Sequence, residues 1–174
     1  MGLEEPAKKA TVQKSDADWM REALILAQQA ASAGEVPVGA LVVKDNHIIG
    51  RGFNQPISSC DPTAHAEILA LRDAAKTIGN YRLIDAVLYV TLEPCTMCTG
   101  AIVHSRVKRV VYAAKEPKAG VVESQAELLT APYMNYQVES VGGICEQESS
   151  ELISSFFAKR RQQKKAEKKD GNAR

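Results

Sequence analysis

An amphipathic helix is the first element that the pattern of apolar and polar residues predicts. Apolar residues recur at the three- and four-residue spacing of one helix face, with Ser15 or Asp16 before them as an N-cap and Gly34 after them as a stop signal. These apolar positions are Met20, Ala23, Leu24, Ala27 and Ala31. We therefore expect the chain to begin its fold with one helix that buries a single face.

Strands are predicted where β-branched and apolar residues cluster. The segments 39–43 and 47–52 flank the polar residues 44–46, which predicts a β-hairpin. The segment 86–92 is apolar and rich in β-branched and aromatic residues, as is typical of a buried strand, and 107–114 gives a further strand. These segments alternate with helical patterns, which favours a layered α/β fold.

The last third of the chain carries weaker patterns. They predict a short helix near 125–129, a strand near 136–141 and a long terminal helix from about Cys145. With the earlier elements, this gives a mixed central sheet of about five strands flanked by helices, in which the later strands run parallel.

Two further helices are predicted from their start signals. Asp61 followed by Pro62 has the residue types of an N-cap and a first helical position, so His65 is expected in the first turn of that helix. Pro94 comes one residue after the apolar run 86–92 and predicts another helix start.

Composition is that of an ordinary globular protein and by itself names no function. The 174 residues are 45% hydrophobic and 25% charged, which fits one domain with its own core. The N-terminus lacks the apolar core of a signal peptide, and no run approaches the roughly 18 apolar residues of a membrane helix. We expect a cytoplasmic protein with no membrane segment, whose four cysteines are reduced.

Charge is concentrated at the C-terminal end. Residues 159–174 hold eight basic and two acidic residues, a net charge of +6 within a formal total of +1. Such a basic end suits binding to a polyanion through its phosphates, and it equally suits a solvated helix end kept soluble by its charge. We divide the chain into a flexible N-terminus (1–14), one domain (15–163) and a basic tail (164–174).

His65, Cys95 and Cys98 are the candidate metal ligands. Imidazole and thiolate are ligands that zinc prefers, and two cysteines three apart lie on one side of a helix turn. A structural zinc site is normally closed by four protein ligands, whereas a catalytic site keeps three and leaves one position open. Three ligands therefore predict a catalytic zinc ion.

Two other interpretations of these residues remain open from the sequence. Cys95 and Cys98 could form a redox pair, although that role leaves His65 and Glu67 unexplained. Cys60 or Cys145 could instead supply a fourth ligand and close the zinc site. Metal analysis of a Cys60 variant separates the closed site from the open one.

Glu67 is the candidate catalytic residue. Two residues after His65, it lies about 200° further around an ideal helix, so it should not be a fourth ligand on the same vector. A carboxylate beside a zinc-activated water can act as the general base that takes up a proton and returns it to the reacting group.

The strings "HAE" and "PCTMC" match the signature of the zinc-dependent nucleoside and nucleotide deaminases. Further segments between residues 18 and 163, among them "DPTAHAEILALR" and "GAIVHSRVKRVVY", resemble the bacterial tRNA-specific adenosine deaminases within that superfamily. The resemblance implies a three-layer cytidine-deaminase-like fold and hydrolytic conversion of adenosine to inosine at the wobble position of a tRNA anticodon arm. It also implies one zinc ion per subunit, no nucleotide cofactor, and a homodimer.

By the same resemblance, His65, Cys95 and Cys98 are the zinc ligands and Glu67 is the proton shuttle. Substrate-binding roles are implied for Asn54, Lys118, Phe157 and Arg161. An asparagine amide offers a purine edge both a donor and an acceptor. Asn54 is also an ordinary turn residue, and Phe157 is also suited to core packing.

Two positions depart from the family pattern: Glu116 stands where aspartate is frequent, and Tyr136 where histidine is common. Neither position affects the metal ligands or the shuttle. One rival function is deamination of a free nucleoside or nucleobase such as cytidine, adenosine or guanine. Another is a catalytically silent RNA-binding subunit with structural zinc, which the presence of Glu67 disfavours.

Overall fold

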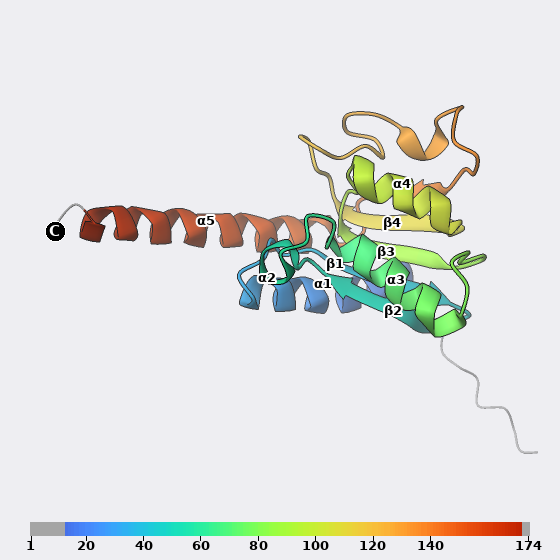
Figure 1. The fold of residues 1–174 in the computed structure, drawn as a ribbon, viewed down its shortest axis with the longest axis horizontal. Coiled ribbons are helices and arrows are strands. Elements are labelled where there is room, and N and C mark those ends of the chain that lie inside the picture. Colours follow the sequence, from blue (N-terminus) through green and yellow to red (C-terminus); the bar gives the residue numbers. More distant parts are fainter. Residues whose placement is uncertain (1–12, 172–174) are drawn as a thin grey trace, which may run out of the picture.

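A mixed five-stranded sheet forms the middle of the molecule in the computed structural model, which describes residues 13–171 (Figure 1). The strand order is β2-β1-β3-β4-β5, antiparallel from β2 to β3 and parallel from β3 to β5. The strands are β1 (Gly39–Lys44), β2 (His47–Phe53), β3 (Val87–Leu92), β4 (Arg109–Ala114) and β5 (Glu139–Val141). The predicted mixed sheet with parallel later strands is confirmed.

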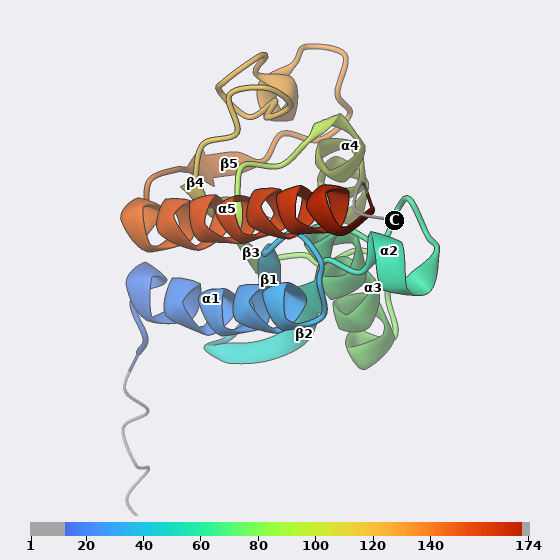
Figure 2. The same ribbon diagram turned by 90° about the vertical axis from the view of Figure 1, so that its left-hand side faces the viewer.

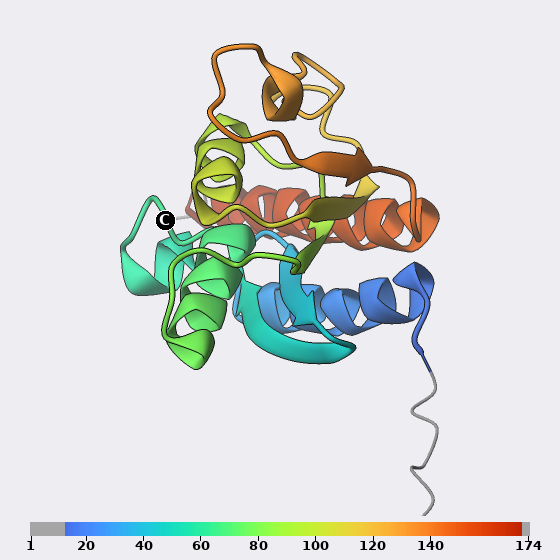
Figure 3. The ribbon, with the colours of Figure 1, turned by 90° about the vertical axis from the view of Figure 1, so that its right-hand side faces the viewer.

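Helices cover both faces of this sheet. The helices α1 (Asp16–Ser32) and α5 (Glu146–Gly171) lie side by side on one face (Figure 2). The helices α3 (Ala66–Ile78) and α4 (Thr96–Ser105) lie on the other (Figure 3). Alternate β1 residues bury against the two sides, Val42 with α3 and α4 and Leu41 with α1. The molecule therefore has three layers with two hydrophobic cores.

The predicted hairpin is present and is closed by a two-residue turn. Lys44 pairs with His47, and the two residues between them, Asp45 and Asn46, have φ of 50° and 60°. Asp and Asn tolerate this left-handed conformation, which matches the twist of the flanking strands. The local sequence was therefore sufficient to predict this element.

The predicted helix start at Asp61 and Pro62 is wrong. The Asp61 carboxylate accepts hydrogen bonds from the backbone nitrogen of Thr63 at 2.8 Å and from its hydroxyl at 2.7 Å. This side-chain turn competes with helix formation. The helix α3 begins only at Ala66, with His65 as an N-cap in extended conformation, so the histidine lies at the helix end and not in its first turn.

The predicted helix at 125–129 is also wrong, because only one 3₁₀ turn forms, at Leu128–Thr130. The following residue, Ala131, has ψ of 137°, the extended conformation that a next proline favours. Further on, α5 runs from Glu146 to Gly171 and passes through the predicted boundary between 163 and 164.

The expected flexible segment 1–14 lies almost wholly outside the described residues, and the proposed division of the chain stays a prediction. Within residues 13–171, none of the helices combines the length and the apolar character needed to cross a membrane.

Close packing fixes the N-terminal end of α3 against the sheet. A Cβ on Gly52 of β2 would lie 2.3 Å from the carbonyl oxygen of Ala66, so only glycine allows this approach. The alanines Ala66, Ala70 and Ala74 present the small face of α3 to the core. The sheet thus holds the helix end that bears His65 and Glu67.

Asp16 ties α1 to the sheet, and its removal should weaken the fold. Its carboxylate accepts hydrogen bonds from both terminal nitrogens of Arg109, at 2.7 and 2.9 Å, and from the Tyr89 hydroxyl at 2.7 Å. The hydrogen bond from Arg109 lowers the Asp16 pKa below its ordinary 3.8, despite an opposing effect of burial. The stabilisation is therefore complete above that ordinary pKa, and it is lost as pH falls through the lower folded pKa.

We predict that Asp16→Asn lowers the free energy of unfolding by about 1–2 kcal/mol at neutral pH, the scale of a charge-assisted hydrogen bond. Urea unfolding at pH 7 and at acid pH measures this, and the difference from the parent should shrink in acid. Asp85→Asn, at an exposed carboxylate, is the control and should change little. An equal effect at both pH values would contradict the ion-pair explanation.

Candidate active site

Three candidate ligand atoms meet where α3 and α4 begin. The Nδ1 atom of His65 lies 3.7 Å from the Cys95 sulfur and 3.5 Å from the Cys98 sulfur. All three atoms are within 4.8 Å of one another, and among the described residues this is the group able to hold a metal ion. His65 and Cys95 are both N-cap residues with extended backbones, so their side chains leave the helix ends towards each other.

These separations suit a tetrahedral zinc ion. Ligand atoms placed about 2.0–2.3 Å from one zinc ion and spread tetrahedrally stand about 3.6 Å apart. The observed distances of 3.5 and 3.7 Å agree with that value. The residues therefore fit the metal without rearrangement of the backbone.

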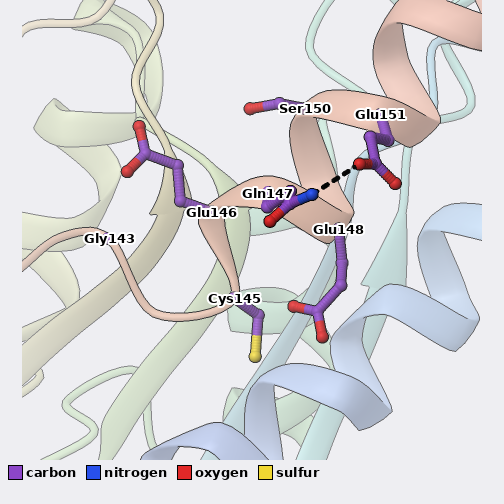
Figure 4. Close-up of a pocket in the computed structure, with 7 residues that line it drawn as sticks. All are labelled: Gly143, Cys145, Glu146, Gln147, Glu148, Ser150 and Glu151. Carbon is purple, nitrogen blue, oxygen red and sulfur yellow. Dashed lines mark hydrogen bonds between the residues drawn. The ribbon is translucent and has the colours of Figure 1, made fainter.

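Neither of the other cysteines belongs to this group. Cys60 is exposed at the end of α2 (Pro56–Ser59), where its thiol points back to the Ile57 carbonyl oxygen at 3.8 Å. Cys145 packs beside α1, 3.9 Å from the Ala17 carbonyl oxygen, and lines a separate cavity at the start of α5 (Figure 4). The three-residue group thus has no fourth sulfur ligand in the described part of the chain.

The two thiols of the group shift each other's pKa in opposite directions. A hydrogen bond from Cys98 lowers the Cys95 pKa to about 4, whereas the same bond raises the pKa of Cys98. The hydrogen bond to Cys95 also raises the His65 pKa. Metal binding to such a group releases protons, because thiolates and neutral imidazole are the ligand forms. All four cysteines are free thiols in the structure.

Glu67 lies in the wall of a cavity that reaches two of the three ligands, His65 and Cys95. The cavity has a volume of about 240 Å³, and its lining includes His65, Cys95, Asn54 and Glu67. Only 4% of Glu67 is exposed, and burial raises its pKa to about 6. A carboxyl group with a pKa near neutrality can take up and give back a proton, which is what general acid–base catalysis needs.

Asn54 connects the cavity to the α3 end. Its side-chain oxygen accepts a hydrogen bond from the backbone nitrogen of Ala66 at 2.9 Å. The His65 side chain accepts no hydrogen bond from the first turn of α3. The Asn54 side chain, which comes from another segment of the chain, therefore provides the acceptor for a free backbone N–H group at the start of this helix. With the oxygen engaged in this way, the amide nitrogen is the Asn54 group suited to donate to a bound molecule.

Comparison with known proteins assigns the chain to a family. A model of the MafB19-like deaminases matches residues 14–161. The tRNA-specific adenosine deaminase of Haemophilus influenzae is 52% identical over 154 residues, which cover 88% of this chain and 89% of that protein. The chain belongs to the tRNA-specific adenosine deaminase family. The family member from Bacillus subtilis is 43% identical over 152 residues, covering 87% and 94% respectively.

A solved structure supports the assignment of this deaminase. It comes from work on A-to-I editing by tRNA:A34 deaminases at the wobble position of transfer RNA, and is 42% identical with a TM-score of 0.76. The match covers 78% of this chain and 98% of that one. The predicted cytidine-deaminase-like fold is confirmed, and the chain is an enzyme that catalyses deamination.

Three residues of the deaminase that the sequence suggested for substrate binding gather in one place. Lys118, Phe157 and Arg161 line a groove of about 410 Å³ between the 115–124 loop, which follows β4, and helix α5. We call it the basic groove. Lys118 is adjacent in sequence to Ala119, which lines the metal cavity, so the groove and the cavity share the loop as a wall.

The two departures from the family pattern have different surroundings. Glu116 lines the metal cavity, and its carboxylate accepts a hydrogen bond from the Lys118 backbone nitrogen at 3.0 Å. Tyr136 lies under the guanidinium of Arg106, 5.6 Å from its ring centre, and packs against the core next to α3 and α4. Of the two residues that differ from the family pattern, Glu116 is therefore the one that lines the candidate active site.

Sequence reasoning missed Glu93, which lines the same cavity and is buried. A signal was present, since Glu93 directly follows the apolar strand β3. In sheets with parallel strands, ligands bind at the carboxyl ends of the strands. Glu93 is a charged residue at such a strand end, two positions before the candidate metal ligand Cys95. It could therefore have been predicted as a residue of the active site.

Proposed function

We propose that this deaminase converts adenosine to inosine at the wobble position of tRNA, using one zinc ion held by His65, Cys95 and Cys98. The observation that carries the proposal is the open three-ligand group beside the buried carboxyl of Glu67, in a cavity of about 240 Å³. When bound, the zinc ion supplies a Lewis acid that lowers the pKa of a coordinated water to about 7. Carbon 6 of adenine is the position attacked in this chemistry.

Glu67 moves the protons in this scheme. Its carboxylate takes one proton from the attacking water and passes it to the ring nitrogen. It then takes the remaining proton from the hydroxyl group added at carbon 6 and passes it to the amine, which departs as ammonia while the carbonyl of inosine forms. Burial keeps bulk water away from the carboxyl and raises its pKa to about 6, so both protonation states are accessible near neutral pH. The Asn54 amide nitrogen donates a hydrogen bond to the base and orients it.

The basic groove beside the cavity suits an RNA strand better than a free base. Phe157 is 41% exposed and offers a ring on which an unpaired base can stack. Lys118 and Arg161 offer cations for the adjacent phosphates. We propose that the groove binds nucleotides flanking the edited adenosine in the anticodon arm, and that the enzyme acts as a homodimer in the cytoplasm.

Product analysis tests this function against its rivals. The zinc-loaded protein is incubated with tRNA and, separately, with adenosine, cytidine and guanine. We expect inosine in the tRNA and no turnover of the free compounds. Turnover of a free base without change in the tRNA would reject the RNA substrate, and absence of all products would favour a silent RNA-binding subunit.

Arg161→Ala should weaken tRNA binding about tenfold and lower the slope of log affinity against log salt concentration by about one. The reason is the loss of one phosphate contact in the basic groove. Fluorescence anisotropy with a labelled anticodon stem-loop over a salt series measures both quantities. Lys76→Ala, an exposed cation on α3, is the matched control and should leave both unchanged. Equal effects of the two variants would contradict a specific groove contact.

A further inference from the structure

Glu93 binds the 115–124 loop through a single carboxylate. Its Oε1 atom accepts hydrogen bonds from the backbone nitrogens of Val122, Glu123 and Ser124 at 3.1, 2.9 and 2.9 Å. Its Oε2 atom accepts from the backbone nitrogen of Glu116 at 3.0 Å and from the Ser124 hydroxyl. These five hydrogen bonds join both ends of the loop to one buried side chain.

The two residues that follow Glu93, Pro94 and the metal-ligand candidate Cys95, also bond to the 115–124 loop. The Pro94 carbonyl oxygen accepts a hydrogen bond from the Val121 backbone nitrogen at 3.1 Å, and Cys95 forms an isolated β-bridge with Gly120. A Cβ on Gly120 would lie 2.4 Å from the Glu93 carboxylate. Glycine at this position is therefore what allows the loop to approach the carboxylate so closely.

The attached loop carries groups that face the substrate. Glu116 and Ala119 line the metal cavity, and Lys118 lines the basic groove. None of these positions lies in a helix or strand of its own, so the hydrogen bonds to Glu93 and its neighbours set where they stand. The metal ligands and Glu67 lie at the starts of α3 and α4, so these helix ends hold them, and Cys95 in addition pairs with Gly120 of the loop.

We infer that Glu93 is a positioning residue for the reaction: it fixes the 115–124 loop as the wall that closes the cavity and presents Lys118 to the RNA. This inference rests on the proposed function for the identity of the substrate. Both carboxylate oxygens are occupied by loop donors, so Glu93 has no oxygen left to serve as a second proton shuttle. Its effect on the reaction passes through the loop.

Glu93→Gln tests the inference, because it keeps the size of the side chain and replaces one acceptor oxygen with a donor. Trypsin cleavage between Lys118 and Ala119, followed by mass spectrometry, reports local opening of the loop without any substrate. We expect cleavage at this bond to be about tenfold faster than in the parent protein. Zinc content should be unchanged.

Kinetics with tRNA separate positioning from a general loss of structure. Loosening of the wall should raise KM about tenfold and change kcat less, because the metal group and Glu67 stay in place. A merely destabilised protein would lose active enzyme, which lowers kcat and leaves KM unchanged. Glu123→Gln removes a carboxylate of the same loop, one that pairs with Lys115 at 2.7 Å, and should alter neither the cleavage nor KM.

If the Glu93→Gln protein does not fold, two substitutions in the 115–124 loop test the same contacts. Gly120→Ala pushes against the carboxylate and should reproduce both effects, and Ser124→Ala removes one donor and should give smaller ones. Unchanged cleavage and unchanged KM in these variants would overturn the inference, as would loss of zinc from a folded Glu93→Gln protein. If the parent protein does not act on tRNA, the proposed function fails while the cleavage result still decides the role of Glu93.

Discussion

Glu67→Gln should reduce deamination by about a thousandfold or more while zinc remains bound, because removal of a general acid–base group commonly costs 10²–10⁴-fold. The substitution keeps the shape of the side chain in its buried position. It removes the group that carries the proton from the water to the base and the amine. Inosine formation in tRNA and zinc content per chain, measured on the same preparation, check the expectation.

Stability provides an independent check on this variant. Burial raises the Glu67 pKa to about 6, above its ordinary 4.5, so the ionised carboxylate costs stability as pH rises beyond that ordinary value. A neutral glutamine avoids this cost, and the variant should unfold at no lower urea concentration than the parent. Glu127→Gln, at an exposed carboxylate outside the cavity lining, is the control and should retain full activity. Full activity of Glu67→Gln would contradict the shuttle role.

Cys98→Ala should abolish both zinc binding and activity, since it removes one of three protein ligands and leaves two. Cys98 is fully buried, and its sulfur lies 3.5 Å from His65 Nδ1. No described cysteine is placed to substitute for it, because the metal-compatible group contains only His65, Cys95 and Cys98. Zinc content after dialysis should fall from about one ion per chain to near zero.

Cys60→Ala is the matched control for this loss, because Cys60 is the cysteine nearest in sequence to His65. Its thiol is exposed and turned towards the Ile57 carbonyl oxygen. The Cys60 variant should keep its zinc and its activity. Loss of zinc in the Cys60 variant would mean that the site is closed by a fourth ligand.

The sequence predicted the elements whose signals are local. The hairpin followed from Asp45 and Asn46 between two apolar runs, and the grouping of His65 with Cys95 and Cys98 followed from their residue types as zinc ligands. Local signals predicted a wrong helix start where a side-chain turn and an N-cap are both possible for the same residue. Asp61 is a good N-cap residue, yet its side chain closes a turn with Thr63 three residues before the helix begins.

Features that depend on distant contacts were not predictable in this way. Nothing near Glu93 in the sequence indicates that its carboxylate receives the backbone of residues 116–124, because that contact joins segments more than twenty residues apart. Likewise, Lys118 and Arg161 meet in one groove only because α5 passes beside the loop that follows β4. Sequence separation hides such pairs until the fold brings them together.

Sequencing of tRNA after incubation with the zinc-loaded protein tests the central claim most directly, since it reports the reaction, the base and the position together. Inosine pairs as guanosine, so an edited adenosine is read as guanosine after reverse transcription. The account predicts this change at the wobble adenosine alone, and its absence with Glu67→Gln. Unchanged tRNA, or inosine scattered over other positions, would contradict it.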